Sequence, residues 1–474
     1  MRRYTLQNAV KFTRRIQSIT CLPLWLVLFS TTQIAAQDQP QSQQIKFYSI
    51  VDIQVSGNKK TKPAVILREM RTQIGDTVSA ADLQYDARRI ESLGLFTRVD
   101  ISLESQENGV ALLIDVTEQW YIFPFPIFYF NDREYTWEKA SYGMSLLHTN
   151  FRGNAETLAC AAWAGYNPGT YLTYSIPAIN GNKHYFLSAR FFLYHVRSKS
   201  LEILNLKTDE NQIGSSVSFG RRLNLENSVQ ISLGFSRIKY DPPVRGQTLN
   251  PSGTDNLPSI SFNFSHNSRD LAWYPRRGSL LSISYQKTGF WNDAHIDYRH
   301  LYLDYRFYHP ILKDLIFATR YTMQMSDGAL PVYNRAYFGY TTRIRGRFDE
   351  RYEGENRMFA SFELRFPIIP VRYIQLEEKS LRGYGRNLKF GISGSFFMDM
   401  GSLWVQSQNL GRYTSGEQYL SSGYFGLQTR PTRWLRGYGA GLNFHLPYVN
   451  IVRLELGFDD DLNTEFIFDA QMSF

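Results

Sequence analysis

The sequence predicts a 16-stranded transmembrane antiparallel β-barrel preceded by one small α+β domain of the order strand, helix, helix, strand, strand. Two observations carry this prediction. Aromatic residues make up 15% of the chain, with 31 Tyr and 33 Phe, yet hydrophobic residues reach only 43%. Beyond residue 120, side chains alternate between apolar and polar as far as the chain end. Both features suit strands that face lipid on one side and water on the other.

The first 36 residues are predicted to be a secretory signal peptide. Basic residues from Arg2 to Arg15 form a positive segment, Ile19 to Phe29 form an apolar segment, and Ile34 to Ala36 resemble a cleavage site. The apolar segment is shorter than the ~20 residues that a membrane-spanning helix needs. We therefore expect this segment to be absent from the folded protein.

The mature chain, without the signal peptide, has a lower net charge and one cysteine fewer than the whole sequence. The whole chain carries 52 Lys and Arg against 43 Asp and Glu; without the five basic residues of the signal, 52 − 5 = 47 oppose 43, so the net charge falls from +9 to +4. A nucleic-acid partner then loses its main support. Only Cys160 remains, which excludes a disulfide framework or a cysteine metal site within one chain.

Residues 47–119 read as the small α+β domain. A first strand stops at Gly57, and Pro63 suits the first position of a helix. The segment Ser79–Asp82 resembles the capping box of a second helix, which ends at Gly94. Two further strands follow, joined by a tight turn at Asn108-Gly109.

Residues 120–474 read as the barrel, with an even number of strands, as closure in lipid requires. The sixteen predicted strands lie near 124–131, 141–151, 154–165, 170–179, 184–197, 211–222, 228–240, 257–267, 278–290, 296–308, 314–325, 356–368, 388–399, 435–446, 450–459 and 465–474. With the N-terminal domain in the periplasm, the long segments 328–355 and 401–432 face outside. The segment 369–387 is long for a periplasmic turn.

The same alternation would also suit a soluble β-sandwich or propeller, with the charges turned outward. The signal peptide and the strand count favour the barrel instead. So does the last strand, where Phe466, Phe468 and terminal Phe474 share one apolar row. Outer-membrane strands commonly close with an aromatic residue, so we interpret this row as a C-terminal strand signal.

The loop between strands 11 and 12 carries three arginines at its tip, Arg343, Arg345 and Arg347, and is long enough to need a function. If it folds back into the lumen, Arg345 needs acceptors, and Glu363 and Asp399 fall on lumen-facing positions of the next two strands. Gly346 would allow a sharp turn there. The alternative is that Arg343, Arg345 and Arg347 form a solvated basic loop on the cell surface.

At this point the residues resemble a known family. Residues 47–119 resemble a single POTRA domain, on the pattern positions Gly57, Gly75, Gly94, Phe96 and Glu118. The barrel resembles the superfamily of BamA, TamA and the two-partner-secretion transporters, also described as bacterial surface antigens. Four motifs in the family's order support this: a periplasmic turn with Asp270, Pro275, Arg277 and Gly278; the loop tip Arg343–Phe348 followed by Glu363–Pro367; Phe396–Gly401; and Gly437–Leu442.

The resemblance implies that Arg345 holds its loop against the barrel wall through Asp399. It also implies an outer-membrane assembly factor that inserts or translocates β-barrel or other polypeptide clients, using the POTRA domain and a seam between the strand around Phe123–Phe130 and the strand that ends at Phe474. The alternatives are a dedicated export pore of two-partner-secretion type and a passive surface porin. Export ranks second because those transporters usually have two POTRA domains and a plug helix, for which residues 37–46 leave no room.

The expected location is the bacterial outer membrane, with the POTRA domain in the periplasm. The expected partners are unfolded outer-membrane or secreted polypeptides, outer-membrane lipids and lipopolysaccharide, and accessory lipoproteins, but no nucleic acid. We expect no enzyme, cofactor or metal, because the eight His are scattered and no nucleophile or phosphate-binding motif is present. The run Asp459–Asp461 is predicted to be a hairpin turn rather than a calcium site.

Overall fold

The computed structural model describes residues 47–130, 137–179, 184–197, 209–243, 247–290, 295–339, 342–347, 352–375, 387–409, 428–447 and 450–469. They all lie within one compact unit, Lys46–Phe474. The predicted signal peptide and terminal Phe474 lie outside the described residues. Within the described ranges, no helix is long and apolar enough to cross a membrane.

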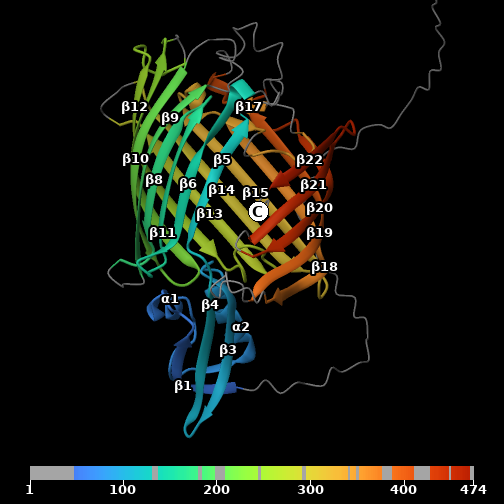
Figure 1. Ribbon diagram of the computed structural model, residues 1–474. Helices are drawn as coiled ribbons and strands as arrows, with labels where there is room; N and C mark the ends of the chain where they lie inside the picture. Colours follow the sequence, from blue (N-terminus) through green and yellow to red (C-terminus); the bar gives the residue numbers. More distant parts are fainter. Residues whose placement is uncertain are drawn as a thin grey trace, which may run out of the picture. The chain divides into compact units, whose positions relative to one another are not determined.

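The N-terminal domain is a four-stranded sheet with two helices (Figure 1). Its elements are β1 (Phe47–Ser56), α1 (Pro63–Leu67), β2 (Thr77–Ser79), α2 (Ala80–Glu91), β3 (Phe96–Gln106) and β4 (Gly109–Glu118). The sheet order is β2-β1-β4-β3, with β1 and β4 parallel and the other pairs antiparallel. The predicted element order is confirmed, with one addition: β2 has three residues, too few to show an alternation in the sequence.

Local sequence signals explain why these elements form. The Ser79 hydroxyl accepts a hydrogen bond from the Asp82 backbone N–H, and the Asp82 carboxylate accepts one from the Ser79 N–H, so a capping box starts α2. The apolar faces of both helices then pack on the sheet. The core contains Ile50, Ile66, Ile90, Leu112 and Ile114, all fully buried.

The predicted POTRA positions lie at the bends of this domain. Gly57, Gly75 and Gly94 all have positive φ, and Phe96 lies in the core. The Glu118 carboxylate accepts hydrogen bonds from the backbone N–H groups of Lys60 (3.0 Å) and Thr61 (2.7 Å). This contact joins the loop after β1 to the end of β4.

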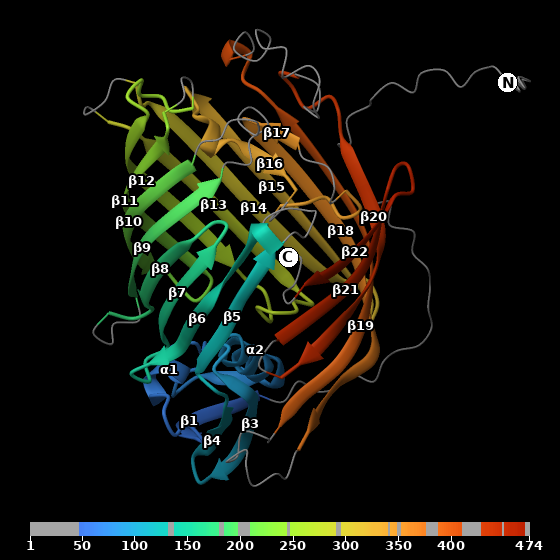
Figure 2. The same ribbon diagram turned by 45° about the horizontal axis from the view of Figure 1, so that its top comes forward.

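The barrel is a single sheet of sixteen strands, as predicted. Each strand is antiparallel to its neighbours along the order β5 to β15 and then β18 to β22, and the sheet curls into a cylinder (Figures 1 and 2). The strands are β5 (Ile122–Phe130), β6 (Ala140–Phe151), β7 (Glu156–Gly165), β8 (Gly169–Ile176), β9 (Tyr185–Arg197), β10 (Asp209–Arg222), β11 (Asn227–Asp241), β12 (Thr254–Asn267), β13 (Gly278–Thr288), β14 (Tyr298–Pro310), β15 (Ile316–Gly328), β18 (Asn356–Ile374), β19 (Leu388–Trp404), β20 (Leu435–Leu446), β21 (Asn450–Asp459) and β22 (Thr464–Asp469).

The two faces of the sheet differ as the alternation predicts. On β18, Ser361, Glu363 and Arg365 are buried, whereas Leu364 between them is exposed. On β22, Phe466 and Phe468 are 70% and 67% exposed. Charged side chains therefore point into the barrel and apolar side chains point out of it, toward lipid.

Two connections contain more structure than a plain loop. Between β15 and β18, the short strands β16 (Ala336–Phe338) and β17 (Tyr352–Gly354) pair with each other, preceded by the 3-10 turn η2 (Val332–Asn334). The predicted long turn 369–387 is partly strand, because β18 extends to Ile374 with register shifts after Pro367. Residues 376–386 of that turn lie outside the described ranges. Two further 3-10 turns are η1 (Trp137–Lys139) and η4 (Ser407–Asn409).

Two glycines of the N-terminal domain allow a matched stability test. A Cβ at Gly57 would lie 1.9 Å from the Val116 carbonyl oxygen, whereas a Cβ at Gly75 would meet nothing within 4 Å; both residues have positive φ. We expect Gly75→Ala to cost about 1–2 kcal/mol of backbone strain, and Gly57→Ala to cost clearly more, because β4 must also move. Protease resistance of this domain in the full-length protein against temperature measures the difference. Equal losses would contradict the steric argument.

Candidate functional site

The loop between β15 and β18 places Arg345 against the inner wall of the barrel. The Arg345 side chain is 4% exposed. Its Nε and Nη2 donate to the two carboxylate oxygens of Asp399, at 2.8 and 2.7 Å, and its Nη1 donates to Glu363 at 2.7 Å and Glu455 at 2.9 Å. The planar guanidinium thus binds Asp399 in fork geometry and bridges two further carboxylates.

Main-chain and aromatic contacts hold the loop tip in the same place. The backbone N–H of Arg345 donates to Asp399 (3.1 Å), and that of Gly346 donates to the Glu465 carboxylate (2.7 Å). The Arg345 guanidinium carbon lies 3.7 Å from the centre of the Phe397 ring. Gly346 has φ +96°, and a Cβ there would lie 2.4 Å from the Phe458 carbonyl oxygen. The turn therefore needs glycine.

The acceptors of this loop tip come from four strands. Glu363 lies on β18, Asp399 on β19, Glu455 on β21 and Glu465 on β22. Sequence reasoning selected Glu363 and Asp399, and the structure brings both to Arg345. It missed Glu455 and Glu465. Their alternation marks them as lumen-facing, but only the curvature of the barrel decides which lumenal carboxylates one loop can reach.

Neighbouring arginines balance the carboxylates. Arg365 pairs with Glu363 at 2.7 Å, and Arg453 bridges Glu455 (3.2 Å) and Asp469 (3.0 Å). Burying a charge without partners is costly, whereas a paired and hydrogen-bonded network is tolerated in a closed interior. We call the residues Arg345, Gly346, Glu363, Asp399, Glu455 and Glu465 the loop clamp.

The predicted periplasmic turn joins the barrel to the N-terminal domain. The Asp270 carboxylate accepts from the side chain of Arg88 on α2 (2.9 Å) and from the backbone N–H of Arg277 (3.2 Å). Pro275 is buried. Gly278 has φ +98°, and a Cβ there would lie 2.2 Å from the Ser268 carbonyl oxygen. The turn is therefore shaped by Gly278 and held to α2 by Asp270.

A second junction was not found from the sequence. Arg222, at the end of β10, donates to both carboxylate oxygens of Glu69, at 2.7 and 2.9 Å, and Arg89 of α2 donates to Glu69 at 3.1 Å. Burial raises the pKa of the Glu69 carboxyl, but the arginines outweigh it, so its pKa lies below the ordinary value. Glu69 is therefore held as a carboxylate.

The two edge strands of the barrel face each other across a seam (Figure 2). Within the described residues, no ladder pairs β5 with β22. The carbonyl oxygen of Tyr121, next to β5, accepts a hydrogen bond from the Thr149 N–H of β6 at 2.9 Å. Main-chain groups alternate in direction along a strand, so the odd-numbered residues of β5 bond to β6 and the even-numbered residues face the seam. Pro124 and Pro126 are even-numbered. The seam edge of β5 thus lacks two N–H donors.

The acidic run that begins at Asp459 forms a turn. The Asp459 carboxylate accepts from the backbone N–H groups of Asp461 (2.9 Å) and Asn463 (2.8 Å), which shapes the turn between β21 and β22. No group of three or more His, Cys, Asp and Glu is placed to hold a metal ion in this part of the chain.

These features define a class: a transmembrane β-barrel with a lumenal loop clamp behind one small α+β domain. Residues 150–474 match the family model of the Omp85 superfamily domain, and residues 48–119 match the POTRA model, described as a surface antigen variable number repeat. The chain belongs to the Omp85 superfamily. Its barrel lies in the bacterial outer membrane and its POTRA domain in the periplasm.

Similar proteins agree with this assignment. One curated relative, the outer membrane protein assembly factor BamA of Nitratidesulfovibrio vulgaris, is 35% identical over 71 residues, which cover 15% of this chain and 9% of the relative. The structure of Haemophilus ducreyi BamA lacking POTRA domains 1–3 has a TM-score of 0.51 at 18% identity, covering 88% of this chain and 82% of that one. CdiB from Escherichia coli has a TM-score of 0.55 at 13% identity, covering 89% and 74%. Both structures show the same fold.

Removing Arg345 tests the loop clamp. Arg345→Ala leaves Asp399, Glu363 and Glu455 facing one another without their shared cation, and we expect it to cost about 3–5 kcal/mol, as for other broken buried pairs. Arg343→Ala is the matched control, because the Arg343 side chain on the same loop is 22% exposed, against 4% for Arg345. For each variant, samples are heated and run on a gel, and the temperature at which the folded band is lost measures the stability of the barrel. Equal shifts would contradict the loop clamp.

Proposed function

We propose that this protein is an outer-membrane assembly factor that inserts or translocates β-barrel or other polypeptide clients through its POTRA domain and the barrel seam. The observation that carries the proposal is that, among the described residues, the edge strands β5 and β22 form no ladder with each other. An open edge is a template to which an extended segment can add through main-chain hydrogen bonds. Client strands would then exchange water for ladder bonds without crossing lipid unpaired.

The two sides of the seam are held unequally. On the β22 side, Glu465 accepts from Gly346 of the loop clamp, and Asp469 binds Arg453 of β21. On the β5 side, Pro124 and Pro126 remove donors, and both faces of the strand are largely exposed. The edge strand β22 is thus held by the barrel wall, whereas β5 can form few hydrogen bonds across the seam. The free energy needed to open the seam is therefore low on the β5 side. The fixed β22 edge, where Phe466 and Phe468 face outward, offers the more regular template.

The POTRA domain provides a second edge, on the periplasmic side. β3 is the outer strand of the sheet next to β4, and eleven residues, Phe96–Gln106, form it. Such an edge accepts an extended polypeptide with little regard to its side chains, which suits unfolded clients. Outer-membrane lipids, lipopolysaccharide and accessory lipoproteins complete the set of partners that we propose.

A seam locked by a disulfide tests this proposal. In a Cys160→Ser background, one cysteine is introduced into β5 and one into β22, and pairs that cross-link are selected by gel shift. The control is Ser218→Cys with Ser232→Cys, which lie opposite each other on the paired strands β10 and β11. In liposomes, we expect the seam lock to abolish insertion of a denatured outer-membrane barrel, reversibly on reduction, and the control lock to have no effect.

The outcomes separate the candidate functions. Normal insertion by the oxidised seam-locked protein would refute the seam mechanism. Loss of insertion together with continued export of a secreted polypeptide would favour the export pore.

Restoring the missing donors tests the weak edge. Pro124→Val with Pro126→Val returns two N–H groups to the seam side of β5, so we expect a more firmly closed seam and insertion at least several-fold slower. Pro258→Val is the control, because Pro258 lies on the interior strand β12. Insertion rates in liposomes report the effect, and an unchanged or faster rate for the double variant would show that the prolines do not govern opening.

A further inference from the structure

The outer face of the barrel carries basic side chains at the cell-surface ends of β9, β10 and β11. Strands alternate in direction from β5, which follows the periplasmic POTRA domain, so β9 and β11 end at the cell surface and β10 starts there. On β11, the odd-numbered Phe235 is exposed, whereas the even-numbered Ile238 and Tyr240 are buried inside the barrel. Arg237 and Lys239 are odd-numbered, so they face outward.

These side chains lie directly above the apolar belt of this wall. The belt includes outward apolar residues on three neighbouring strands: Phe191 and Leu193 on β9, Ile213 and Val217 on β10, and Leu233 and Phe235 on β11. Toward the cell surface, the next outward residue of each strand is polar, namely His195, Asn211 and Arg237. Because the apolar band of a membrane barrel is only about 25 Å tall, this change marks the level at which hydrocarbon gives way to lipid headgroups.

The pairing of the strands gathers cations and apolar surface into one site. Two rows of paired outward residues line a depression of about 470 Å³: Leu193, Ile213 and Arg237 in one row, and His195, Asn211 and Lys239 in the next. Leu193 and Ile213 lie at the end nearer the belt, and the second row lies nearer the cell surface. The depression is therefore amphipathic along the membrane normal, as a lipid is.

Arg237 is a cation without a carboxylate partner among the described residues. Its Nε donates to the Asn256 side-chain oxygen at 2.8 Å, which orients the guanidinium. Within the described ranges, its two terminal nitrogens make no hydrogen bond, so they can bind a phosphate in fork geometry. Lys239 is the next outward residue, about 7 Å along the strand. It reaches Asp241 only at 3.7 Å, and both side chains are more than half exposed, so this pair is weak.

The neighbouring wall also carries outward basic residues at its cell-surface end, but these are neutralised. Lys287 and Arg299 lie opposite each other on β13 and β14. Lys287 pairs with Asp297, and Arg299 pairs with Asp327 at 2.8 Å. Each of these two cations has its own carboxylate, whereas Arg237 has none in the part of the chain that the structure describes. An added anion is therefore favoured at β11 and not at β14.

We propose that the depression binds a phosphorylated glycolipid of the outer leaflet, the lipid A part of lipopolysaccharide. Arg237 and Lys239 bind a phosphate, and Leu193 and Ile213 contact the acyl chains beside it. The occupant follows from the position of the cations, which lie at headgroup level on the face that meets lipid and next to apolar surface that a free phosphate would not use. The inference rests on the proposed function, because lipopolysaccharide is one of the partners proposed there.

A titration of the full-length protein in detergent with lipid A tests the site, with bound lipid counted by native mass spectrometry. A charge-assisted contact of this kind accounts for at least about a tenfold difference in affinity, so we expect Arg237→Gln to weaken lipid A binding by that factor. Arg237→Lys should retain part of the affinity. Arg299→Gln is the matched control, because Arg299 also faces outward but binds Asp327, and we expect less than about a twofold change.

Three outcomes would overturn the inference. The first is equal binding of lipid A by the wild-type protein and by Arg237→Gln, when both show the folded gel band. The second is an equal loss of affinity in Arg299→Gln, since general surface charge would then explain the effect. The third is equal binding of lipid A before and after removal of its phosphates. Displacement of lipid A by inorganic phosphate at the same concentration would likewise count against a lipid site, because the ligand would then be free phosphate.

The proposed function fails separately. β11 is the seventh of the sixteen strands counted from β5, so Arg237 lies far around the barrel from the seam. We expect Arg237→Gln to insert clients at the wild-type rate in liposomes that lack lipid A. If the seam-locked protein inserts clients normally while the wild-type protein still prefers phosphorylated lipid A, the seam mechanism falls and the lipid site stands.

Discussion

The buried guanidinium of Arg345 organises the closing half of the barrel. A cation inside a protein must be paired, and this one is paired by carboxylates from β18, β19 and β21, while the next residue of the loop binds β22. The Arg345 side chain therefore fixes the loop and joins three strands, and the Gly346 backbone N–H adds the fourth. Because the carboxylates repel one another without it, the loop and the wall depend on each other. The network therefore stabilises β18, β19, β21 and β22, on one side of the seam.

The main chain of the barrel must also be paired, because each N–H or C=O group without a hydrogen-bond partner is costly in lipid. In the described part of the chain, fourteen of the sixteen strands have two neighbours each, whereas β5 and β22 have one neighbour each and direct their other main-chain groups to the seam. The prolines of β5 lessen the demand, since a residue without an N–H has no donor to leave unpaired. The missing N–H groups also weaken the closure of the seam. The edge of β5 is therefore less costly to leave unpaired, and an incoming strand can approach it.

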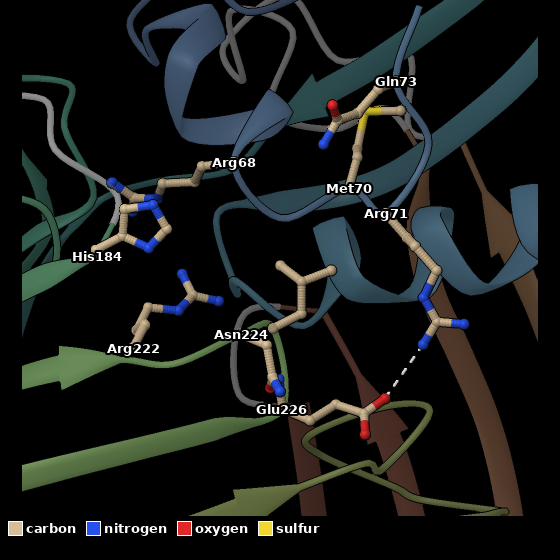
Figure 3. Close-up of a pocket in the computed structure, with 9 residues that line it drawn as sticks. Arg68, Met70, Arg71, Gln73, His184, Arg222, Asn224 and Glu226 are labelled. Carbon is tan, nitrogen blue, oxygen red and sulfur yellow. Dashed lines mark hydrogen bonds and ion pairs between the residues drawn. The ribbon is translucent and has the colours of Figure 1, made fainter. Parts of the chain in front are cut away.

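Charged groups join the POTRA domain to the barrel, beside apolar contacts that Tyr121 and Ala155 make with the POTRA core. Asp270 binds Arg88, and Glu69 binds Arg222 and Arg89. Such contacts are directional, so they help to set the position of the POTRA domain on the periplasmic turns. They also leave a surplus of arginine at the mouth of the lumen. The region that joins the two domains thus contains a cavity lined by Arg68, Arg71 and Arg222 (Figure 3).

The sequence alone determined the strands and their faces, because a period of two is a local property that each strand carries in its own residues. It also indicated Arg345, Glu363 and Asp399 as a group, on the condition that the loop folds into the lumen, and only the structure shows that Arg345 is buried there. It could not supply Glu455, Glu465 or the pairing of Glu69 with Arg222. These residues are 110, 119 and 153 positions from their partners, and only the closure of the sheet and the docking of the POTRA domain bring such distant charges together.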